Sequence, residues 1–525
     1  MKSNINPTHW CVSHGCCGCS PGLSRRGFLK GCGATAALGA FSPLLASSEA
    51  VPEEKIRIAL VFFANSKTTL EMWPYPDFDC DRRIREVTQA LRVGCPLFEF
   101  STVVVATPAD FPKALALKDS VDGYLVYVVT LNWEMGLGNL IPQIGKPLIV
   151  ANEFLGGCGS FLTGVSAVRQ RNIPLAAVSS TRLEDLVAAA RVFAEVKKPG
   201  STPAVFAQKC EEAYRQTFPA PGKTKSKEDK VALAEISECL ERLKESTFLV
   251  VGAGKPGTEQ TFLNGTKAIH VGFEEFKIHY QAVDKDQAAA WGSRWIREAE
   301  KVVDAAPPWI NKAGGMYLAM QSLMKKYGTE NITMNCLGGF GAGQIEAYPC
   351  LGFRQLLNDG QQGVCEAMPA DSISMLMGRY LTGRPGYVSD PALDTSRNQI
   401  CYSHCMAHTK VFGTNGPANP FRIRTLHNRD PRGCCAQSFM PEGYLTTSFL
   451  VYLGSKTLVI HQAQAMGNLD VDRGCRTQLV GEVRGDIVKL FNHWDAWHRV
   501  TLYGDVKEPL AELGRALGLK IVEEA

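Results

Sequence analysis

Three residues with metal-binding side chains follow short apolar runs between residues 361 and 408. Glu366, Asp390 and His404 each come directly after one such run. If the runs are strands, the two carboxylates and the imidazole stand at strand ends, where ligands bind in open α/β sheets. Two hard oxygen donors and one imidazole suit a divalent ion resembling Mn²⁺. The pattern therefore predicts a metal site built from these three side chains.

Each member of this set also has a purely structural interpretation. Asp390 precedes Pro391 and could open a turn, and His404 could be a core residue whose hydrogen bonds are satisfied. Apolar residues recur with a helical period from 371 to 381, between the first two runs. The segment is therefore predicted to run strand, helix, turn, strand, turn, strand, and both interpretations stay open.

Apolar, β-branched runs predict strands at 56–63, 123–129 and 147–151 near the start of the chain. Helical patterns at 81–92 and 183–196 alternate with them, which is typical of a parallel, doubly wound domain. The predicted fold class is α/β, with two doubly wound parallel-sheet domains followed by a β-rich, barrel-like C-terminal domain. The length of 525 residues is sufficient for several domains.

The later domains are expected from a change of pattern along the chain. A glycine-rich segment at 338–343 predicts a flexible loop, and the sequence beyond Asp390 is rich in residues typical of strands and turns. The expected elements are helices at 231–245, 284–305, 308–326 and 509–517, and strands at 248–251, 457–461, 477–482 and 487–491. The predicted boundaries are 1–50 for a leader, then 51–245, 246–384, which carries Glu366, and 385–525.

The first 50 residues are typical of a twin-arginine export signal. Arg25 and Arg26 precede a weakly apolar stretch of small residues and a small-residue end at 48–50, although a disordered basic tail is the alternative. We therefore expect export to the periplasm or the exterior. No apolar run reaches about 18 residues, so no stable membrane anchor is expected. A net charge of +4 without a long Lys/Arg stripe gives no reason to expect a nucleic-acid partner.

Cysteine usage is high, with 18 cysteines in the chain. Five of them lie in the leader, where a run of His and Cys could bind a soft metal: Cys11, Cys16, Cys17, Cys19 and Cys32. The others are scattered without a CxxC pair, so the sequence does not define their pairing. Cys401 and Cys405 flank His404 and could turn its site towards zinc, or could pack in the core. The adjacent Cys434 and Cys435 could pair elsewhere or be buried.

A glycine motif offers a different function. Gly252, Gly254 and Gly257 follow a predicted strand and match GxGxxG. With the acidic pair Glu274–Glu275 further on, the motif permits a nicotinamide-dependent oxidoreductase. Pro256 inside the loop and a short, broken segment after it favour a simple glycine turn instead.

Several motifs together resemble the L-fucose isomerase and L-arabinose isomerase superfamily. Cys365–Glu366 is followed by a predicted helix, then by Arg384–Pro385, and then by Asp390, 24 residues after Glu366. His404–Cys405 and Trp497–His498 resemble the two histidine motifs of that family. The resemblance covers most of the chain after the leader in outline, and it is strongest around the first two motifs.

The resemblance implies roles for individual residues. Glu366 is the expected ligand and leading base, and Asp390 the expected ligand and partner acid or base. His404 and His498 are the expected neutral metal ligands, with His493 as the fallback for His498. The family also implies a monosaccharide substrate, a divalent metal, here Mn²⁺, and a homo-oligomer, either a trimer or a hexamer. Its glycine turn binds no nicotinamide.

The leading interpretation is a metal-dependent aldose–ketose isomerase that acts through an enediolate. The alternatives are an exported sugar-binding protein that keeps the isomerase fold without turnover and, less favoured, a nicotinamide-dependent oxidoreductase. Trp494 and Trp497 could stack on a sugar face or fill the barrel. His408 and His461 are expected to be structural.

Overall fold

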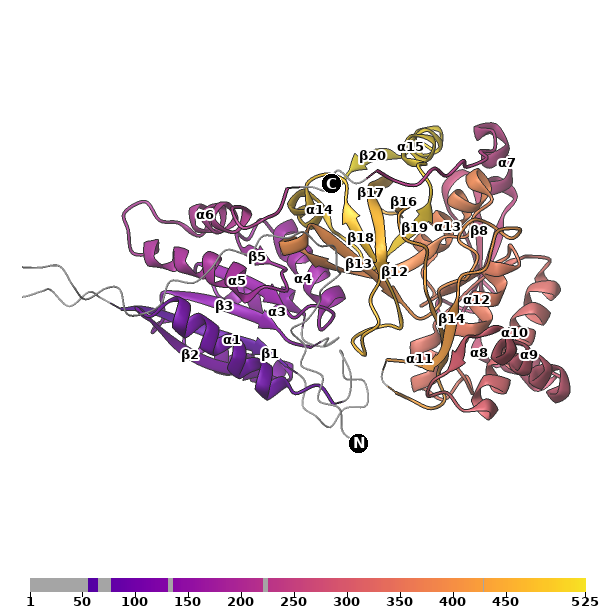
Figure 1. The fold of residues 1–525 in the computed structure, drawn as a ribbon, viewed down its shortest axis with the longest axis horizontal. Coiled ribbons are helices and arrows are strands. Elements are labelled where there is room, and N and C mark those ends of the chain that lie inside the picture. Colours follow the sequence, from indigo (N-terminus) through magenta and orange to yellow (C-terminus); the bar gives the residue numbers. More distant parts are fainter. Residues whose placement is uncertain (1–54, 65–76, 131–135, 221–224, 428) are drawn as a thin grey trace, which may run out of the picture. The chain divides into compact units, whose positions relative to one another are not determined.

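The structure is a computed structural model, shown as a ribbon in Figure 1. It describes residues 55–64, 77–130, 136–220, 225–427 and 429–525. The predicted export signal at 1–50 and its five cysteines lie outside the described residues. By its contacts Lys55–Ala525 is one unit, so the domain boundaries after 245 and 384 stay predictions.

The first sheet contains five parallel strands in the order β2-β1-β3-β4-β5. Side chains of β1 alternate between two cores, since Ile58 and Leu60 pack on one face while Ala59 and Val61 pack on the other. Burial on both faces explains why this strand is an uninterrupted apolar run after the exposed Arg57. The strands are β1 (Ile56–Phe63), β2 (Phe98–Val105), β3 (Gly123–Val128), β4 (Leu148–Asn152) and β5 (Ala176–Val178). The helices of this region are α1 (Cys80–Gly94), α2 (Phe111–Leu115), α3 (Leu137–Leu140), α4 (Cys158–Gln170), α5 (Leu183–Ala190) and α6 (Pro203–Arg215).

The second sheet has the strand order β11-β10-β6-β8-β7, and β7 at its edge is antiparallel. Its strands are β6 (Thr247–Val251), β7 (Glu259–Thr261), β8 (Lys267–Val271), β10 (Asn331–Met334) and β11 (Gln362–Cys365). The helices are α7 (Ile236–Glu245), α8 (Phe273–Gln281), α9 (Lys285–Glu298), α10 (Pro307–Tyr327), α11 (Cys336–Gly341), α12 (Cys350–Asn358) and α13 (Pro369–Thr382). Helices α8, α9 and α12 pack against α10, and α7 packs against α13. Strand β11 ends directly before Glu366.

The C-terminal region is a closed barrel of six strands. Their order is β16-β19-β12-β13-β18-β17, and pairing of β17 with β16 closes the ring. The strands are β12 (Tyr387–Asp394), β13 (Gln399–His404), β16 (Leu445–Tyr452), β17 (Thr457–Asn468), β18 (Thr477–Val483) and β19 (Arg499–Tyr503). Figure 1 shows α13 beside β16 and β19. The predicted fold class, two parallel α/β sheets followed by a barrel, is confirmed.

Smaller elements complete the barrel region. Strand β20 (Lys520–Glu523) pairs with β17, and α15 (Lys507–Ala516) packs on both. A separate sheet of β9 (Lys301–Val302), β14 (Phe421–Thr425) and β15 (Cys434–Ser438) joins the second region to the third. Helix α14 (Ile487–His493) lies between β18 and β19 in the chain.

Several predicted elements were wrong in type or in extent. The helix expected at 284–305 ends at Glu298 and is followed by β9. The flexible loop expected at 338–343 is mostly α11, because the Asn335 side chain accepts a hydrogen bond from the backbone of Gly338 and caps that helix. The strand expected at 487–491 is α14, capped by Asp486. The helix expected from 231 begins at Ile236. The residues before it are not helical, and the backbone N–H of Ala234 donates to the carbonyl oxygen of Leu381 instead.

The glycine motif forms a turn held by packing. Strand β7 follows it, so the turn lacks the helix N-terminus that the dinucleotide fingerprint requires. Gly252 and Gly254 have positive φ, and a Cβ on them would meet the rings of Phe273 and His270 at 2.1 and 2.3 Å. These contacts explain both glycines without a bound nucleotide.

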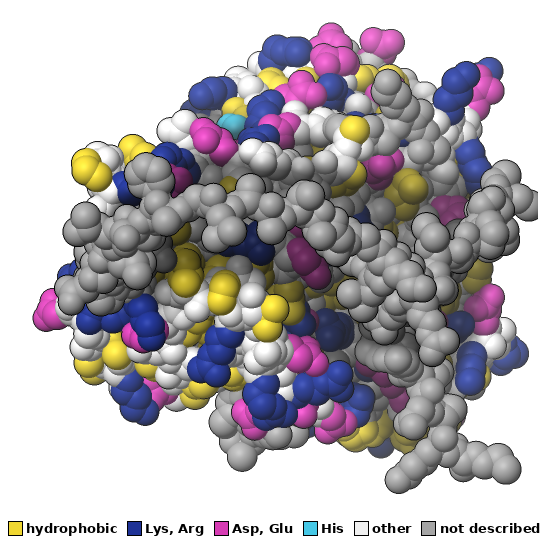
Figure 2. Space-filling view, turned by 60° about the vertical axis from the view of Figure 1, so that its left-hand side comes forward, with side chains coloured by type: hydrophobic (Ala, Val, Ile, Leu, Met, Phe, Trp, Pro, Cys, Tyr) yellow, Lys and Arg dark blue, Asp and Glu magenta, His cyan; other side chains and the backbone are white. Residues whose placement is uncertain are grey.

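The described surface mixes charges of both signs. On the face drawn in Figure 2, basic and acidic side chains are interspersed among hydrophobic and neutral ones. Among the described helices, none combines the length and the hydrophobicity needed to cross a membrane.

Candidate metal centre

Glu366 stands at the carboxyl end of β11 in an unusual backbone conformation. Its φ is 66° and that of Ala367 is 52°, so two consecutive residues with side chains adopt the left-handed region. Each such residue costs on the order of 1–3 kcal/mol and is kept where the surroundings impose it. Helix α13 then begins at Pro369, whose fixed φ suits the first helical turn. This tight turn directs the Glu366 carboxylate towards the barrel.

Asp390 and His404 come from neighbouring antiparallel strands of the barrel. Asp390 lies inside β12 opposite Ser403, and the strand continues through Pro391 to Asp394. The expectation that Asp390 ends a strand, or opens a turn, was therefore wrong, because pairing with β13 extends β12. His404 is the last residue of β13. The two carboxylates thus come from different sheets.

His498 directly precedes β19 and points into the same space. Its Nδ1 lies 2.6 Å from a carboxylate oxygen of Asp371, a residue in the first turn of α13. Both side chains are almost fully buried. A carboxylate on one imidazole nitrogen fixes the ring and leaves the other nitrogen for a ligand. Asp371 was not singled out from the sequence, where an acid near a helix start resembles an ordinary capping charge.

The four predicted ligands are here called the hard donor set: Glu366, His404 and His498 have donor atoms within 4.8 Å of one another, and Asp390 lies beside both histidines. The Nε2 atom of His404 lies 3.8 Å from Glu366 Oε1 and 4.0 Å from Asp390 Oδ2. The Nε2 atom of His498 lies 3.7 Å from Glu366 Oε2 and 3.5 Å from Asp390 Oδ1. Ligands about 2.0–2.2 Å from a shared ion stand roughly 3–4 Å apart. Both Nε2 atoms are buried, and among the described residues neither has a hydrogen-bond partner.

The charges of the hard donor set influence one another. Burial acts to raise the pKa of Glu366, but the two imidazoles outweigh burial and lower that pKa. Burial raises the pKa of Asp390 to about 6, against the opposing effect of the same imidazoles. Burial acts to lower the pKa of His498, yet Asp371 and the other carboxylates raise it to about 10. Two carboxyl groups with oppositely shifted pKa values can take different roles in proton transfer.

The hard donor set opens into a pocket of about 770 Å³. Its wall includes Glu366, Asp390 and His404, together with Leu155 and Gly159 from the first sheet region. Trp497 lines the pocket, whereas Trp494 is buried beneath the Arg499 guanidinium, 3.6 Å from its ring centroid. Of the two predicted tryptophans, Trp497 is therefore the one that can meet a ligand.

A second group of donors lies on the same wall. Cys405, His427 and Cys475, here called the soft donor set, have donor atoms within 4.8 Å of one another. Side-chain hydrogen bonds with Cys435 and Cys475 lower the pKa of the Cys405 thiol well below its usual value. Cys401, the other predicted neighbour of His404, instead packs with Ala392 in a small core. No local pattern in the sequence groups His427 and Cys475 with Cys405.

The remaining candidate histidines lie elsewhere. His493, the fallback ligand, is exposed, and its Nδ1 lies 2.8 Å from the carbonyl oxygen of Lys489. His461 is buried between the Tyr402 hydroxyl and the Glu524 carboxylate, at 2.7 and 2.8 Å. His408 is buried, and burial lowers its pKa to about 3. None of these three histidines joins the hard donor set among the described residues.

Comparisons with known proteins find similarity to sugar isomerases. No family model matches the chain. It is similar to the sulfoquinovose isomerases of Priestia aryabhattai and Priestia megaterium, each at 25% identity over 304 residues. The similarity is to sugar isomerases. The match covers 54% of this chain and 66% of each relative, so the chain spans just under two thirds of their length.

A likeness to a solved structure is weaker. A periplasmic solute-binding protein of an ABC transporter from Actinobacillus succinogenes 130z, with bound D-allose, shares 10% identity at a TM-score of 0.16. The likeness covers 53% of this chain and 77% of that one. A TM-score this low carries no argument about fold or function.

Proposed function

We propose that this protein is a metal-dependent aldose–ketose isomerase of the L-fucose isomerase and L-arabinose isomerase superfamily. The observation that carries the proposal is the convergence of the hard donor set from widely separated parts of the chain. The similarity to sulfoquinovose isomerases supports the same class of reaction. The proposed substrate is a monosaccharide.

The hard donor set has the chemistry of a divalent metal site, and we propose Mn²⁺ as its ion. Carboxylate oxygens with imidazole nitrogens suit such an ion. A buried imidazole nitrogen without a partner is costly, and a metal ligand bond would satisfy both His404 and His498. The contact with Asp371 favours a proton on Nδ1 of His498, so Nε2 is the nitrogen that would give up its proton and bind the ion.

The proposed chemistry moves one proton between adjacent sugar carbons and another between their oxygens. The hard donor set would hold the divalent ion, which would supply positive charge to stabilise the negative charge that develops on the sugar oxygens. Glu366 would remove the carbon-bound proton and return it to the neighbouring carbon, while Asp390 would exchange the hydroxyl proton. Both carboxylates are 23% exposed, so a sugar in the pocket can reach them.

The pocket suits a small polar ligand with an apolar face. Its wall is mostly apolar, with the carboxylates of Glu366 and Asp390 as convergent polar groups, which is typical of small-molecule sites. Trp497 offers an aromatic surface against which a sugar ring could stack. Sulfoquinovose, the sugar in the names of the two relatives, belongs among the substrates to be tried first.

The test is proton exchange measured on the whole protein. The purified chain is stripped with EDTA, reloaded with Mn²⁺, Mg²⁺ or Zn²⁺, and incubated in D₂O with a panel of aldoses that includes sulfoquinovose. We expect NMR spectra to show ketose formation, with solvent deuterium at carbon 1 of the ketose and at carbon 2 of the recovered aldose, only in metal-loaded samples. Sugar binding by calorimetry without ketose or deuterium exchange would favour a sugar-binding protein. Turnover that survives complete metal removal would contradict the metal role.

Export and assembly belong to the same proposal. We propose that the twin-arginine signal sends the folded protein to the periplasm or the exterior, and that the protein assembles as a trimer or hexamer. Fractionation of cells expressing wild type and an Arg25→Lys, Arg26→Lys variant tests the first point, since the variant should stay inside. Light scattering after size-exclusion chromatography tests the second.

A further inference from the structure

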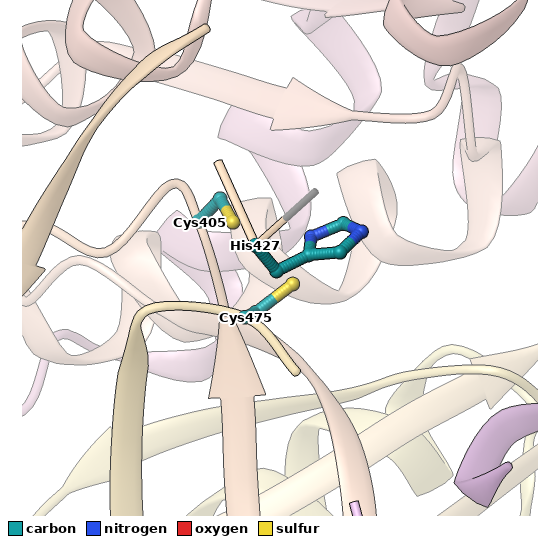
Figure 3. Close-up of side chains that lie close together, drawn as sticks. All are labelled: Cys405, His427 and Cys475. Carbon is teal, nitrogen blue, oxygen red and sulfur yellow. The ribbon is translucent and has the colours of Figure 1, made fainter. Parts of the chain in front are cut away.

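The soft donor set is assembled from three separate segments beside the hard donor set. Cys405 follows β13, His427 lies two residues after β14, and Cys475 lies two residues before β18. All three are buried, with exposures of 5%, 8% and 5%. Figure 3 shows the sulfur atoms of Cys405 and Cys475 directed towards the His427 ring. Residues so far apart in the chain meet here only through the tertiary fold.

Hydrogen bonds hold these three segments together independently of the donors. The Arg476 guanidinium, 1% exposed, donates to the carbonyl oxygens of Thr425 and Leu426 at 2.8 and 2.9 Å, which ties the end of β14 to the segment of Cys475. The carbonyl oxygen of Cys475 accepts from Ser403 at 3.3 Å. A site whose supporting backbone is fixed in this way is preorganised for a ligand.

The donors themselves specify the class of ligand. Two thiolates with one imidazole suit Zn²⁺ or Cu⁺ and do not suit Mn²⁺. With Zn–S and Zn–N bonds of about 2.3 and 2.0 Å, tetrahedral ligands stand roughly 3.3–3.8 Å apart. Since the donor atoms lie within 4.8 Å of one another, the most distant pair would have to approach by at most about 1.5 Å. Three protein ligands leave a fourth position open.

We propose that Cys405, His427 and Cys475 form a second metal site, for Zn²⁺, whose open position faces the pocket of the hard donor set. All three residues line that pocket, as do Glu366 and Asp390. The zinc site is independent of the isomerase proposal, because a soft ion would bind whether or not the neighbouring site turns over a sugar.

The test uses Co²⁺ as a spectroscopic probe for Zn²⁺ in the full chain. Thiols of the leader would also bind cobalt, so the starting protein carries serine at five positions: Cys11, Cys16, Cys17, Cys19 and Cys32. We expect this reduced, EDTA-treated protein to give the near-ultraviolet thiolate-to-cobalt charge-transfer absorption on adding Co²⁺. Cys405→Ser and Cys475→Ser should each lose it, together with one equivalent of bound zinc.

Cys210→Ser is the matched control, because Cys210 is a buried thiol in α6 that donates to the carbonyl of Ala189, far from the pocket. It should keep the absorption. X-ray absorption of the zinc-loaded starting protein needs no variant and should show two sulfur neighbours at about 2.3 Å. The proposal is overturned if the starting protein gives no thiolate absorption and only oxygen or nitrogen neighbours. It is also overturned if the absorption persists in both serine variants, or if mass spectrometry finds a Cys405–Cys475 disulfide in the purified, metal-free protein.

Discussion

The hard and soft donor sets share one pocket but differ in chemistry and exposure. The carboxylates of the hard set are 23% exposed, while every member of the soft set is below 9%. The two sets meet at the peptide bond between His404 and Cys405, where β13 ends. Successive side chains of a strand point to opposite sides, so one strand end can serve two sites. Two residues that are adjacent in the chain, His404 and Cys405, can therefore belong to two sites with different donor atoms.

The largest expected effect separates the two sets completely. Glu366→Gln keeps the shape of the side chain but removes the proposed base and a charged ligand, so isomerase turnover should fall roughly 10²–10⁴-fold. Thiolate-to-cobalt absorption should remain, because Glu366 is outside the soft donor set. Ketose formation and the cobalt spectrum are measured on the same preparation. Loss of both signals in a folded variant would mean that the two sets act as one cluster.

A smaller loss of metal affinity or turnover is expected on replacing Asp371, the residue that orients His498. Asp371→Asn should weaken Mn²⁺ affinity or turnover by about 10–100-fold, since it removes the carboxylate that holds Nδ1 of the imidazole. Metal titration by calorimetry and the pH profile of kcat/KM report this role. Asp371→Glu, which keeps the charge, should recover part of the loss. Unchanged affinity and an unchanged pH profile in Asp371→Asn would mean that Asp371 only stabilises the first turn of α13 and does not orient His498.

The smallest effect is expected five residues away from His498. His493→Ala should leave metal binding and turnover unchanged and should alter the free energy of unfolding by no more than about 0.5 kcal/mol, because its side chain is exposed. His498→Ala, measured in parallel, should lose Mn²⁺ binding. If the two variants behave alike in metal titration and thermal unfolding, His498 is not a metal ligand and does not belong to the hard donor set.

The fold could be predicted where burial leaves a simple sequence pattern. β3 and, from Ile58 on, β1 are apolar because both faces of their sheet are buried, and both strands were predicted within one residue. The loop predicted at 338–343 failed because glycine content hides a helix that a single side chain, Asn335, caps. Local composition is a poor guide where one long-range or capping contact decides the structure.

Part of the hard donor set could be predicted from the sequence, because three of its members lie close together in the chain. Glu366, Asp390 and His404 lie within one stretch, where spacing and strand-like runs made a joint prediction possible. His498 came only from a family resemblance. Asp371, His427 and Cys475 had no distinguishing local signal, since the nearest partner of each is at least 22 residues away in the chain and the fold alone brings them together.

The left-handed backbone at Glu366 and Ala367 opposes conformational stability to the proposed catalytic role. Glycine would relax this backbone at either position, whereas the carboxylate is what the proposed reaction needs at the first. A variant library screened solely for heat resistance would therefore enrich glycine at 366 and discard the acid in doing so.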